Sequence, residues 1–398
     1  MSNNIPIFSA KEQYPQISAD LEAAVLEVLR SGNYIMGQKN KTLEQQIAKV
    51  CGVKHGIGVA NGTDALILAL WALDIGPGDE VITTPFTFAA TIEAIAMHGA
   101  KPVFVDVDEK TFNIDPKAIE RVITPKTKAI IPVHLYGQSS DMDPIMDLAV
   151  RYALKVVEDN AQAIGATYKG KPTGCFGDAA CISFYPTKNL GACGDAGMIV
   201  TDSDELAERL RCLRAHGSKQ RYFHEELGVN SRLDEIQAAV LLTKLRHLDD
   251  WTEKRRAIAG KYFDVLKNVP NIILPNPAVK TEYRHVWHQY TIRVLETNFG
   301  TTGATMRQQL IDGLAKRGIG SMCYYPVPLH LQQAFQGYGY KQGDFPITER
   351  LAAEVLSLPM FPELKDEEIQ AVGNAISEIM TGEIAVPHVV APTPPVII

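Results

Sequence analysis

HGIGVANGTDALILALWALDIGPGDEVITTPFTFAATIEAIAMHGAKPVFV, residues 55–105, alternates short β-rich runs with helical patterns. The alternation predicts strands at 55–60, 80–83 and 102–105, with helices at 63–73 and 89–97 between them. Gly76-Pro77-Gly78 ends the first helix. Strand and helix at this spacing favour a mostly parallel, doubly wound sheet. Because such sheets bind ligands beyond the carboxyl ends of their strands, motifs that follow a strand carry extra weight.

The same rhythm continues along the chain, with expected strands at 129–133 and 154–158. A helical stretch from Arg232 to about Leu266 then leads to a smaller second part. In that part we expect a strand at 287–294 and helices at 305–316 and 366–380. The domains expected are 1–250, 251–381 and a proline-rich tail, 382–398.

Bulk composition limits the classes of function. The chain has 398 residues and a formal net charge of −7, which argues against a general nucleic-acid binder. Its start resembles no signal peptide, and no apolar run is long enough to cross a bilayer. The six cysteines show no CxxC pair or metal-ligand spacing, so no metal site is expected. We therefore expect a cytoplasmic globular protein with reduced thiols.

The first candidate site is Asn61-Gly62-Thr63-Asp64, between a predicted strand and a predicted helix. Gly62 lets the backbone approach a ligand, and Thr63 can cap the helix. Free N–H groups and the helix dipole at such a start bind anions. A plain strand–turn–helix junction has the same pattern, so the motif alone leaves both interpretations open.

The second candidate site is Asp159, just past the apolar run LKVV. Its carboxylate is expected at the carboxyl edge of the sheet. Enzymes that use pyridoxal phosphate (PLP) need an acidic group beside the pyridine nitrogen, because the protonated ring withdraws electrons from the substrate carbanion. A solvated aspartate that caps a helix is the alternative.

The third candidate site is SFYPTKNLG, residues 183–191, in which a short strand leads to Lys188 in a glycine-rich loop. A lysine that forms a Schiff base must be partly deprotonated, and burial favours this. Ser183 can offer a hydroxyl group to a phosphate. A lone loop lysine is ordinarily a solvated charge. The order of anion cradle, acid and lysine, each at a predicted strand end, favours PLP chemistry.

These segments also carry a family resemblance. The chain resembles the DegT/StrS-type sugar aminotransferases, which are fold-type I PLP enzymes, from about Ile5 to Met380. The motifs that carry it are GVANGTDALILAL, PFTFAAT, PVHLYGQSSDMD, VVEDNAQAIGATYKGKPTGCFGDAACISFYPTKNLGACGDAGMIVT and GVNSRLDEIQAA. The resemblance implies an α/β fold with a large PLP-binding domain and a smaller C-terminal α+β domain.

The resemblance also implies roles for individual residues. Lys188 would be the Schiff-base lysine, Asp159 the partner of the pyridine nitrogen, and Gln162 a contact of the ring's 3-oxygen. The other expected cofactor contacts are Gly62, Thr63 and Ser183 at the phosphate and Phe88, which would stack on the ring. Phe88 is equally compatible with an ordinary core position. Asn230 resembles an asparagine that reaches the neighbouring subunit's cofactor, which implies a homodimer with shared sites.

The substrate implied is a nucleotide-linked keto sugar, with L-glutamate as amino donor. SFYPTKNLGACGDAG and the segment that ends in GVNSRLDEIQAA resemble enzymes for 3-keto sugars, linked to dTDP or UDP. Thr187 departs from them, because close 3-keto relatives often have glycine there. Arg232 can pair with a phosphate or a sugar carboxylate, or form a structural ion pair. The other expected sugar contacts are Tyr185, Tyr325 and His330.

Three alternatives remain open at this stage. The chain can be an aminotransferase for a 4-keto sugar nucleotide or a cyclitol. It can also be a non-enzymatic PLP-fold protein with a regulatory role. A sugar dehydratase of the same family is disfavoured because such relatives replace the lysine with histidine, whereas this chain keeps Lys188.

Overall fold

A computed structural model describes residues 4–220, 222–275, 283–295 and 303–382. Its centre is a seven-stranded sheet in the order β1-β9-β8-β5-β4-β2-β3. Six strands run in one direction, and β9 alone is antiparallel to its neighbours. The strands are β1 (His55–Val59), β2 (Glu80–Thr83), β3 (Lys101–Phe104), β4 (Thr127–Ile130), β5 (Lys155–Asp159), β8 (Ala179–Ser183) and β9 (Gly197–Thr201). The protein therefore has the expected α/β fold with a mostly parallel sheet.

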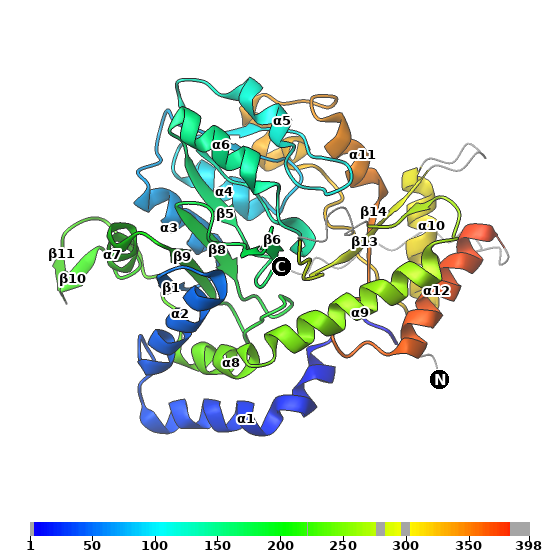
Figure 1. Ribbon diagram of the computed structural model, residues 1–398, viewed down its shortest axis with the longest axis horizontal. Coiled ribbons are helices and arrows are strands. Elements are labelled where there is room, and N and C mark those ends of the chain that lie inside the picture. The colour runs from blue at the N-terminus through cyan, green and yellow to red at the C-terminus, as the bar shows by residue number, and fades with distance from the viewer. Residues whose placement is uncertain (1–3, 221, 276–282, 296–302, 383–398) are drawn as a thin grey trace.

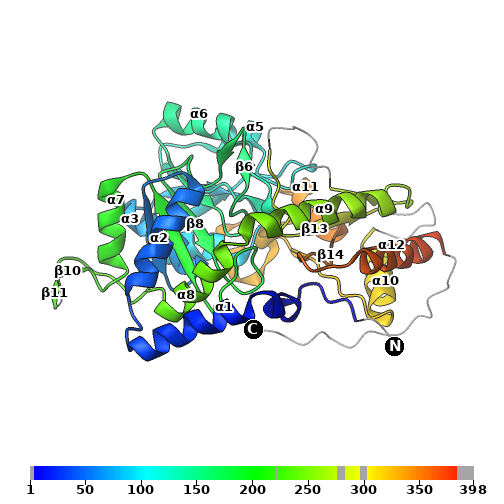
Figure 2. The same cartoon turned by 60° about the horizontal axis from the view of Figure 1, so that its bottom comes forward.

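Helices flank this sheet (Figure 1). They are α1 (Ala10–Ser31), α2 (Gln38–Cys51), α3 (Gly62–Ala72), α4 (Ala89–Met97), α5 (Pro116–Ile119), α6 (Met142–Tyr152), α7 (Asp204–Leu213) and α8 (Glu235–Leu245). Helix α3 packs on β8 and β9, and most of its side chains are buried, as its apolar sequence requires. Helix α1 crosses one end of the molecule and packs against α8 (Figure 2).

A smaller α+β part follows α9 (Leu248–Leu266), which runs along it to the edge of the molecule (Figure 1). Its antiparallel sheet joins β12 (Ile272–Ile273), β13 (Tyr290–Val294) and β14 (Val355–Leu358), and its helices are α10 (Gly303–Lys316), α11 (Pro346–Glu354) and α12 (Asp366–Thr381). Side chains of α9, β13, β14 and α12 share one buried core. This agrees with the expected smaller C-terminal domain of α+β type.

Short elements complete the fold. The β6–β7 hairpin (Thr167–Tyr168 and Lys171–Pro172) lies near α9, and the β10–β11 hairpin (Ser218–Gln220 and Phe223–His224) projects from the large part (Figure 1). Short 3₁₀ helices are η1 (Glu120–Val122), η2 (Leu135–Gly137), η4 (Leu329–Leu331) and η5 (Gln333–Tyr338). Among the described residues, no helix combines the length and apolar character that a membrane span requires.

The structure corrects two sequence expectations. The helical stretch expected from Arg232 to Leu266 is two helices, α8 and α9, separated at Arg246 and His247. There the His247 amide bonds to Lys244 O at 2.9 Å, an i−3 contact that tightens the last turn of α8. Apolar spacing continues across such a break, so it does not reveal the change. The strand expected at 287–294 begins only at Tyr290.

Other boundaries differ by one to three residues, and Asp159 is the last residue of β5 rather than the residue after it. The expected domain boundary at 250 falls near the start of α9, and the division into domains stays a prediction. The expected proline-rich tail, 382–398, lies outside the described residues except for Gly382.

Candidate active site

Three chain segments meet at the carboxyl edge of the sheet. The start of α3 follows β1, Asp159 ends β5, and the Lys188 loop follows β8. Strands β1, β5 and β8 run in the same direction, so their carboxyl ends lie at the same edge. The topology therefore brings the three sequence motifs to one place.

Asp159 is buried and accepts two hydrogen bonds. Thr91 Oγ1 donates to Oδ2 at 2.8 Å, and the Ala161 amide donates to Oδ1 at 3.2 Å. Burial raises the pKa of Asp159 above its ordinary value, and these two bonds and the charge of Lys188 offset only part of that effect. A cationic N–H group placed beside this carboxylate would stabilise its charged form.

Lys188 lies in a turn, where its amide bonds to Tyr185 O at 2.8 Å. Burial lowers the pKa of the Lys188 ammonium group to about 8, although the charge of Asp159 opposes the change. A substantial fraction of this amine is therefore neutral near physiological pH. The neutral amine is the form that attacks a carbonyl group.

The N-terminus of α3 offers free backbone donors. Asn61 caps the helix by accepting from the Asp64 amide at 2.8 Å, and the first intrahelical bond is that of the Ala65 amide to Asn61 O at 3.1 Å. The amides of Gly62 and Thr63 precede that bond, so they can serve an anion. A Cβ atom on Gly62 would lie 2.7 Å from Ser183 Cβ, so only glycine brings the helix this close to the end of β8.

Gln162 links this edge to an aromatic group. Its Oε1 accepts from the Tyr136 amide at 2.7 Å, and its Nε2 donates to the Tyr325 hydroxyl at 3.2 Å. The Tyr325 ring lies 6.1 Å from that of Phe88. Phe88 is 57% exposed at the start of α4, so it is no core residue in this chain.

These residues fit PLP. The α3 amides and Ser183 suit its phosphate, Asp159 its ring nitrogen and Lys188 its aldehyde, while Phe88 has an exposed face for the ring. Among the described residues, no group of three or more His, Cys, Asp or Glu side chains could hold a metal ion. The donor set thus favours an anionic, aromatic carbonyl compound.

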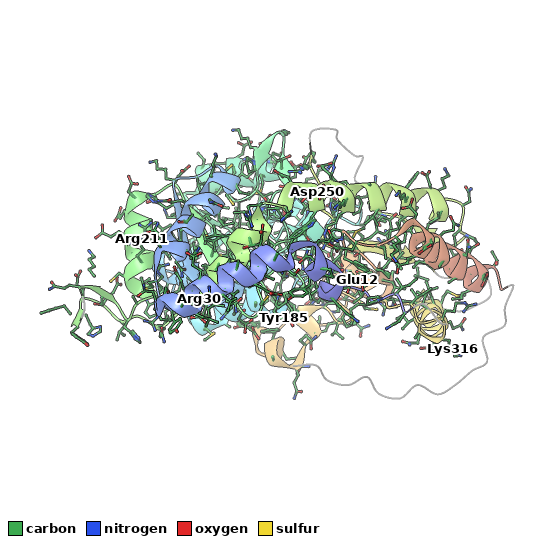
Figure 3. All side chains as sticks on the ribbon, turned by 90° about the horizontal axis from the view of Figure 1, so that it is seen from below. Glu12, Arg30, Tyr185, Arg211, Asp250 and Lys316 are labelled. Carbon is green, nitrogen blue, oxygen red and sulfur yellow. The ribbon has the colours of Figure 1, made fainter. Side chains whose placement is uncertain are left out.

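For three other expected site residues the structure gives surroundings but no side-chain contact with Lys188 or Asp159. Tyr185, labelled in Figure 3, is 50% exposed and follows the end of β8. Asn230 is exposed and pairs through its backbone with Ala215. Arg232 is partly buried and forms no ion pair with any residue that the structure describes. The roles of these three side chains remain predictions.

His330 has a different environment from the one expected of a sugar contact. Its side chain is fully buried, its Nε2 lies 3.0 Å from Glu349 Oε1, and its ring packs edge-on against Phe345. A side chain enclosed in this way presents no surface to a sugar. We therefore assign His330 a packing role in this structure.

Two groups that the sequence did not single out support Asp159. Thr91, in the first turn of α4, donates the hydroxyl hydrogen bond to Asp159 described above. Its place at the end of the PFTFAAT motif was the only sign of this role in the sequence. Behind Asp159, Glu158 accepts from His134 Nε2 at 2.9 Å. The amides of Gly174, Phe176 and Gly177 donate to the same carboxylate at 2.8, 2.8 and 3.0 Å.

The Glu158 carboxylate is ionised within the core. Burial by itself would raise its pKa, but the hydrogen bonds from His134, Gly177 and Gly174 outweigh that effect and hold the pKa below its ordinary value. His134 Nδ1 accepts from the Ser140 amide at 3.1 Å, so the ring proton is on Nε2. The pair is thus a carboxylate and a neutral imidazole.

Comparison with known proteins places the chain in a family. The model of the DegT/DnrJ/EryC1/StrS aminotransferase family matches residues 15–377. The chain belongs to that family. The aminotransferase is 52% identical to a "pleiotropic regulatory protein" of Geobacillus stearothermophilus, with 94% of this chain and 98% of the relative covered.

Two further comparisons concern enzymes. The aminotransferase is 47% identical to the dTDP-3-amino-3,6-dideoxy-alpha-D-galactopyranose transaminase of Aneurinibacillus thermoaerophilus, over 94% of this chain and 99% of that protein. Its fold matches the crystal structure of S. venezuelae DesV in complex with a ketimine intermediate, with a TM-score of 0.89 and 44% identity. That match covers 94% of this chain and 98% of DesV.

Proposed function

We propose that this aminotransferase binds PLP at Lys188 and transfers the amino group of L-glutamate to a nucleotide-linked 3-keto sugar. The observation that carries the proposal is the pairing of Lys188, whose pKa burial lowers to about 8, with the buried Asp159 at one sheet edge. A lysine and an acid with shifted pKa values are typical of a catalytic site.

Each residue has a stated task. Bound PLP supplies an electron sink for the carbanion formed at the amino-bearing carbon. Asp159 holds a proton on the ring nitrogen, and Thr91 orients that carboxylate through its 2.8 Å bond. Lys188 Nζ would hold the cofactor through its aldehyde, and the free amine of Lys188 would take the proton from the donor's α-carbon. The α3 amides and Ser183 hold the phosphate, and Gln162 orients the ring.

The proposed sugar is a 3-keto sugar linked to dTDP or UDP, with Tyr185, Tyr325 and Arg232 as contacts. Likeness to a dTDP-3-amino sugar transaminase supports this choice. The test is a panel of 3-keto and 4-keto sugars linked to dTDP, UDP and GDP, incubated with glutamate and read by mass spectrometry. Amination of 3-keto members supports the proposal, whereas amination confined to 4-keto sugars or cyclitols contradicts the substrate assignment.

A regulatory role is the second candidate, because a pleiotropic regulatory protein is 52% identical. A binding protein has no need of a paired Lys188 and Asp159. Adding glutamate to the PLP-bound protein separates the two roles. Conversion of the bound cofactor, followed in the visible spectrum, with release of 2-oxoglutarate supports an enzyme, and an unchanged spectrum supports binding alone.

We also propose a homodimer with shared active sites. Large apolar side chains are exposed on α1, on the segment after it, and on and just after the β10–β11 hairpin: Leu26, Leu29, Tyr34, Ile35, Met36, Tyr222, Phe223 and Leu227. Such a surface is typical of an interface. In this proposal Asn230 reaches the cofactor phosphate of the partner.

Mixing two inactive variants tests the shared sites. Lys188→Ala and Asn230→Leu chains would form hybrids in which one site keeps both residues, so activity should return on mixing. If the mixture stays inactive while sedimentation shows hybrid dimers, Asn230 acts within its own subunit. The free state of all six cysteines, three of them buried, is consistent with the proposed cytoplasmic location.

A further inference from the structure

The segment Val286–Gln289 precedes β13 and touches both sides of the candidate site. On one side, the Val286 amide donates to Gly137 O at 3.0 Å and the His288 amide donates to Tyr136 O at 3.0 Å. On the other, Asn189, the residue after Lys188, donates from Nδ2 to Val286 O at 2.8 Å. The segment therefore joins the Lys188 loop to the 136–137 turn.

Glycine at 137 permits this close approach. Its φ is +97°, and a Cβ atom there would lie 2.8 Å from Val286 Cγ2 and 3.0 Å from the His288 amide nitrogen. The neighbouring Tyr136 amide donates to Gln162 Oε1 at 2.7 Å. Gln162 is thus tied to the same segment that holds Asn189.

His288 provides the side-chain contact between this segment and the Lys188 loop. Its Nδ1 lies 3.3 Å from Asn189 Oδ1, and the amide orientation is fixed because Asn189 Nδ2 already donates to Val286 O. An amide oxygen only accepts, so Nδ1 carries the proton. Nε2 is then free to accept from Gln289 Nε2, 3.5 Å away.

The imidazole is neutral at working pH. Burial holds the pKa of His288 well below its ordinary value, and the charges of Lys188 and Arg255 lower it further. A ring that stays neutral cannot donate a proton as an imidazolium ion. Its hydrogen bond to the neighbour of Lys188 is therefore the function that the geometry supports.

We propose that His288 is a positioning residue that acts through Asn189 to hold Lys188 and Gln162 against the same ligand. This inference rests on the proposed role of Lys188 in binding the cofactor. It gives a specific task to a buried histidine whose side-chain hydrogen bonds go to Asn189 and Gln289.

His285 offers a matched control. It too is a buried histidine of the same segment, and burial lowers its pKa to about 3. Its ring stacks on Trp287, with 4.0 Å between centroids, and its Nδ1 accepts from the Trp287 amide at 2.8 Å. His285 makes no hydrogen bond with the Lys188 loop among the described contacts. Replacing it tests what loss of a buried imidazole does by itself.

The experiment compares His288→Ala, His288→Asn and His285→Ala. PLP is added to each cofactor-free protein, and its attachment to Lys188 is followed by absorbance and by mass spectrometry after borohydride reduction. His288→Ala should slow attachment about tenfold, the effect of losing one buried hydrogen bond. His288→Asn should recover much of the rate, because its Nδ2 can replace the Nδ1 donor, and His285→Ala should attach PLP at the wild-type rate.

Asn189→Ala covers the case in which His288→Ala fails to fold. It removes the His288 contact and also the bond to Val286 O, so it should slow attachment at least as much as His288→Ala. The double variant should be no slower than Asn189→Ala alone. Equal slowing by His285→Ala and His288→Ala, or wild-type attachment in Asn189→Ala, overturns the inference. Attachment to a lysine other than Lys188 in wild-type protein would instead contradict the proposed function.

Discussion

Two histidine–glutamate pairs of similar geometry lie in different parts of this molecule, one fully buried and one with a partly exposed glutamate. His134 Nε2 is 2.9 Å from Glu158, and His330 Nε2 is 3.0 Å from Glu349. The first pair lies behind the candidate site and the second lies beside Phe345, in the region that leads to α11. The same pair of residue types, a histidine and a glutamate, therefore occurs in both regions.

The pairs differ in what their backbones hold. Glu158 precedes Asp159, and the His134 amide donates to Asp159 O at 3.0 Å, so this pair fixes the end of β5. Glu349 accepts from the Gly343 amide at 2.8 Å and so closes a surface loop. The comparison teaches that a histidine–glutamate pair inside the fold indicates function only when the chain connects it to a reacting group.

The largest expected effect on turnover is that of replacing Asp159 itself. Asp159→Asn keeps the shape but removes the charge that holds the ring nitrogen protonated, so turnover should fall at least about a hundredfold, equivalent to about 2.7 kcal/mol. The measurement is the rate of the glutamate half-reaction. Turnover near the wild-type value would contradict the role assigned to Asp159.

Glu158→Gln should act through stability and through Asp159. In the wild-type protein four donors share the two oxygens of Glu158, whereas the glutamine side chain offers them one oxygen. We therefore expect a loss of about 3 kcal/mol in the free energy of unfolding. Because the folded pKa of Glu158 is lowered, the stability that its charge contributes is present above the unfolded pKa and disappears as the pH falls through the folded one. Chemical denaturation across acid pH measures this, and faster PLP release should accompany it.

Glu349→Gln is the matched variant in the other region. It should lower the free energy of unfolding by about 1 kcal/mol, since it weakens one hydrogen-bonded cluster near the surface. Turnover and PLP release should remain at wild-type values. Loss of turnover in the folded Glu349→Gln protein would show that the two pairs do not differ as described.

The smallest effect concerns Lys188 and stability. The folded pKa of Lys188 is lowered from 10.5 to about 8, so its partly buried charge costs stability below pH 8, and the cost fades as the pH rises toward 10.5. Cofactor-free Lys188→Met should therefore be slightly more stable than wild type below pH 8, by under about 1 kcal/mol because the side chain is partly exposed. A difference that grows with pH would contradict the lowered pKa.

Much of the fold followed from the sequence. Helix α4 has the bounds that its apolar pattern predicts, and the strands carrying Asp159 and Ser183 lie where their β-rich runs place them. The break between α8 and α9 did not follow, because it depends on tertiary packing that keeps the helical spacing on both sides.

The candidate site was predicted in part. Residues adjacent in the chain to a strand end, such as Asp159 and Lys188, could be found because the sheet edge brings them together. The contacts of His134 and His288 could not be predicted, because they join residues that are 24 and 99 positions apart in the chain. His330 looked accessible from sequence, but only the fold shows that Phe345 and Glu349 enclose it.

The central claim is that Lys188 is the residue that holds the cofactor. Lys244 is a suitable rival, because it too is buried and burial lowers its pKa, yet its Nζ donates to Gly191 O at 2.8 Å. The direct test is borohydride reduction of the PLP-bound protein followed by peptide mass spectrometry. The account predicts a phosphopyridoxyl group on Lys188 alone, and its presence on Lys244 or any other lysine instead would contradict it.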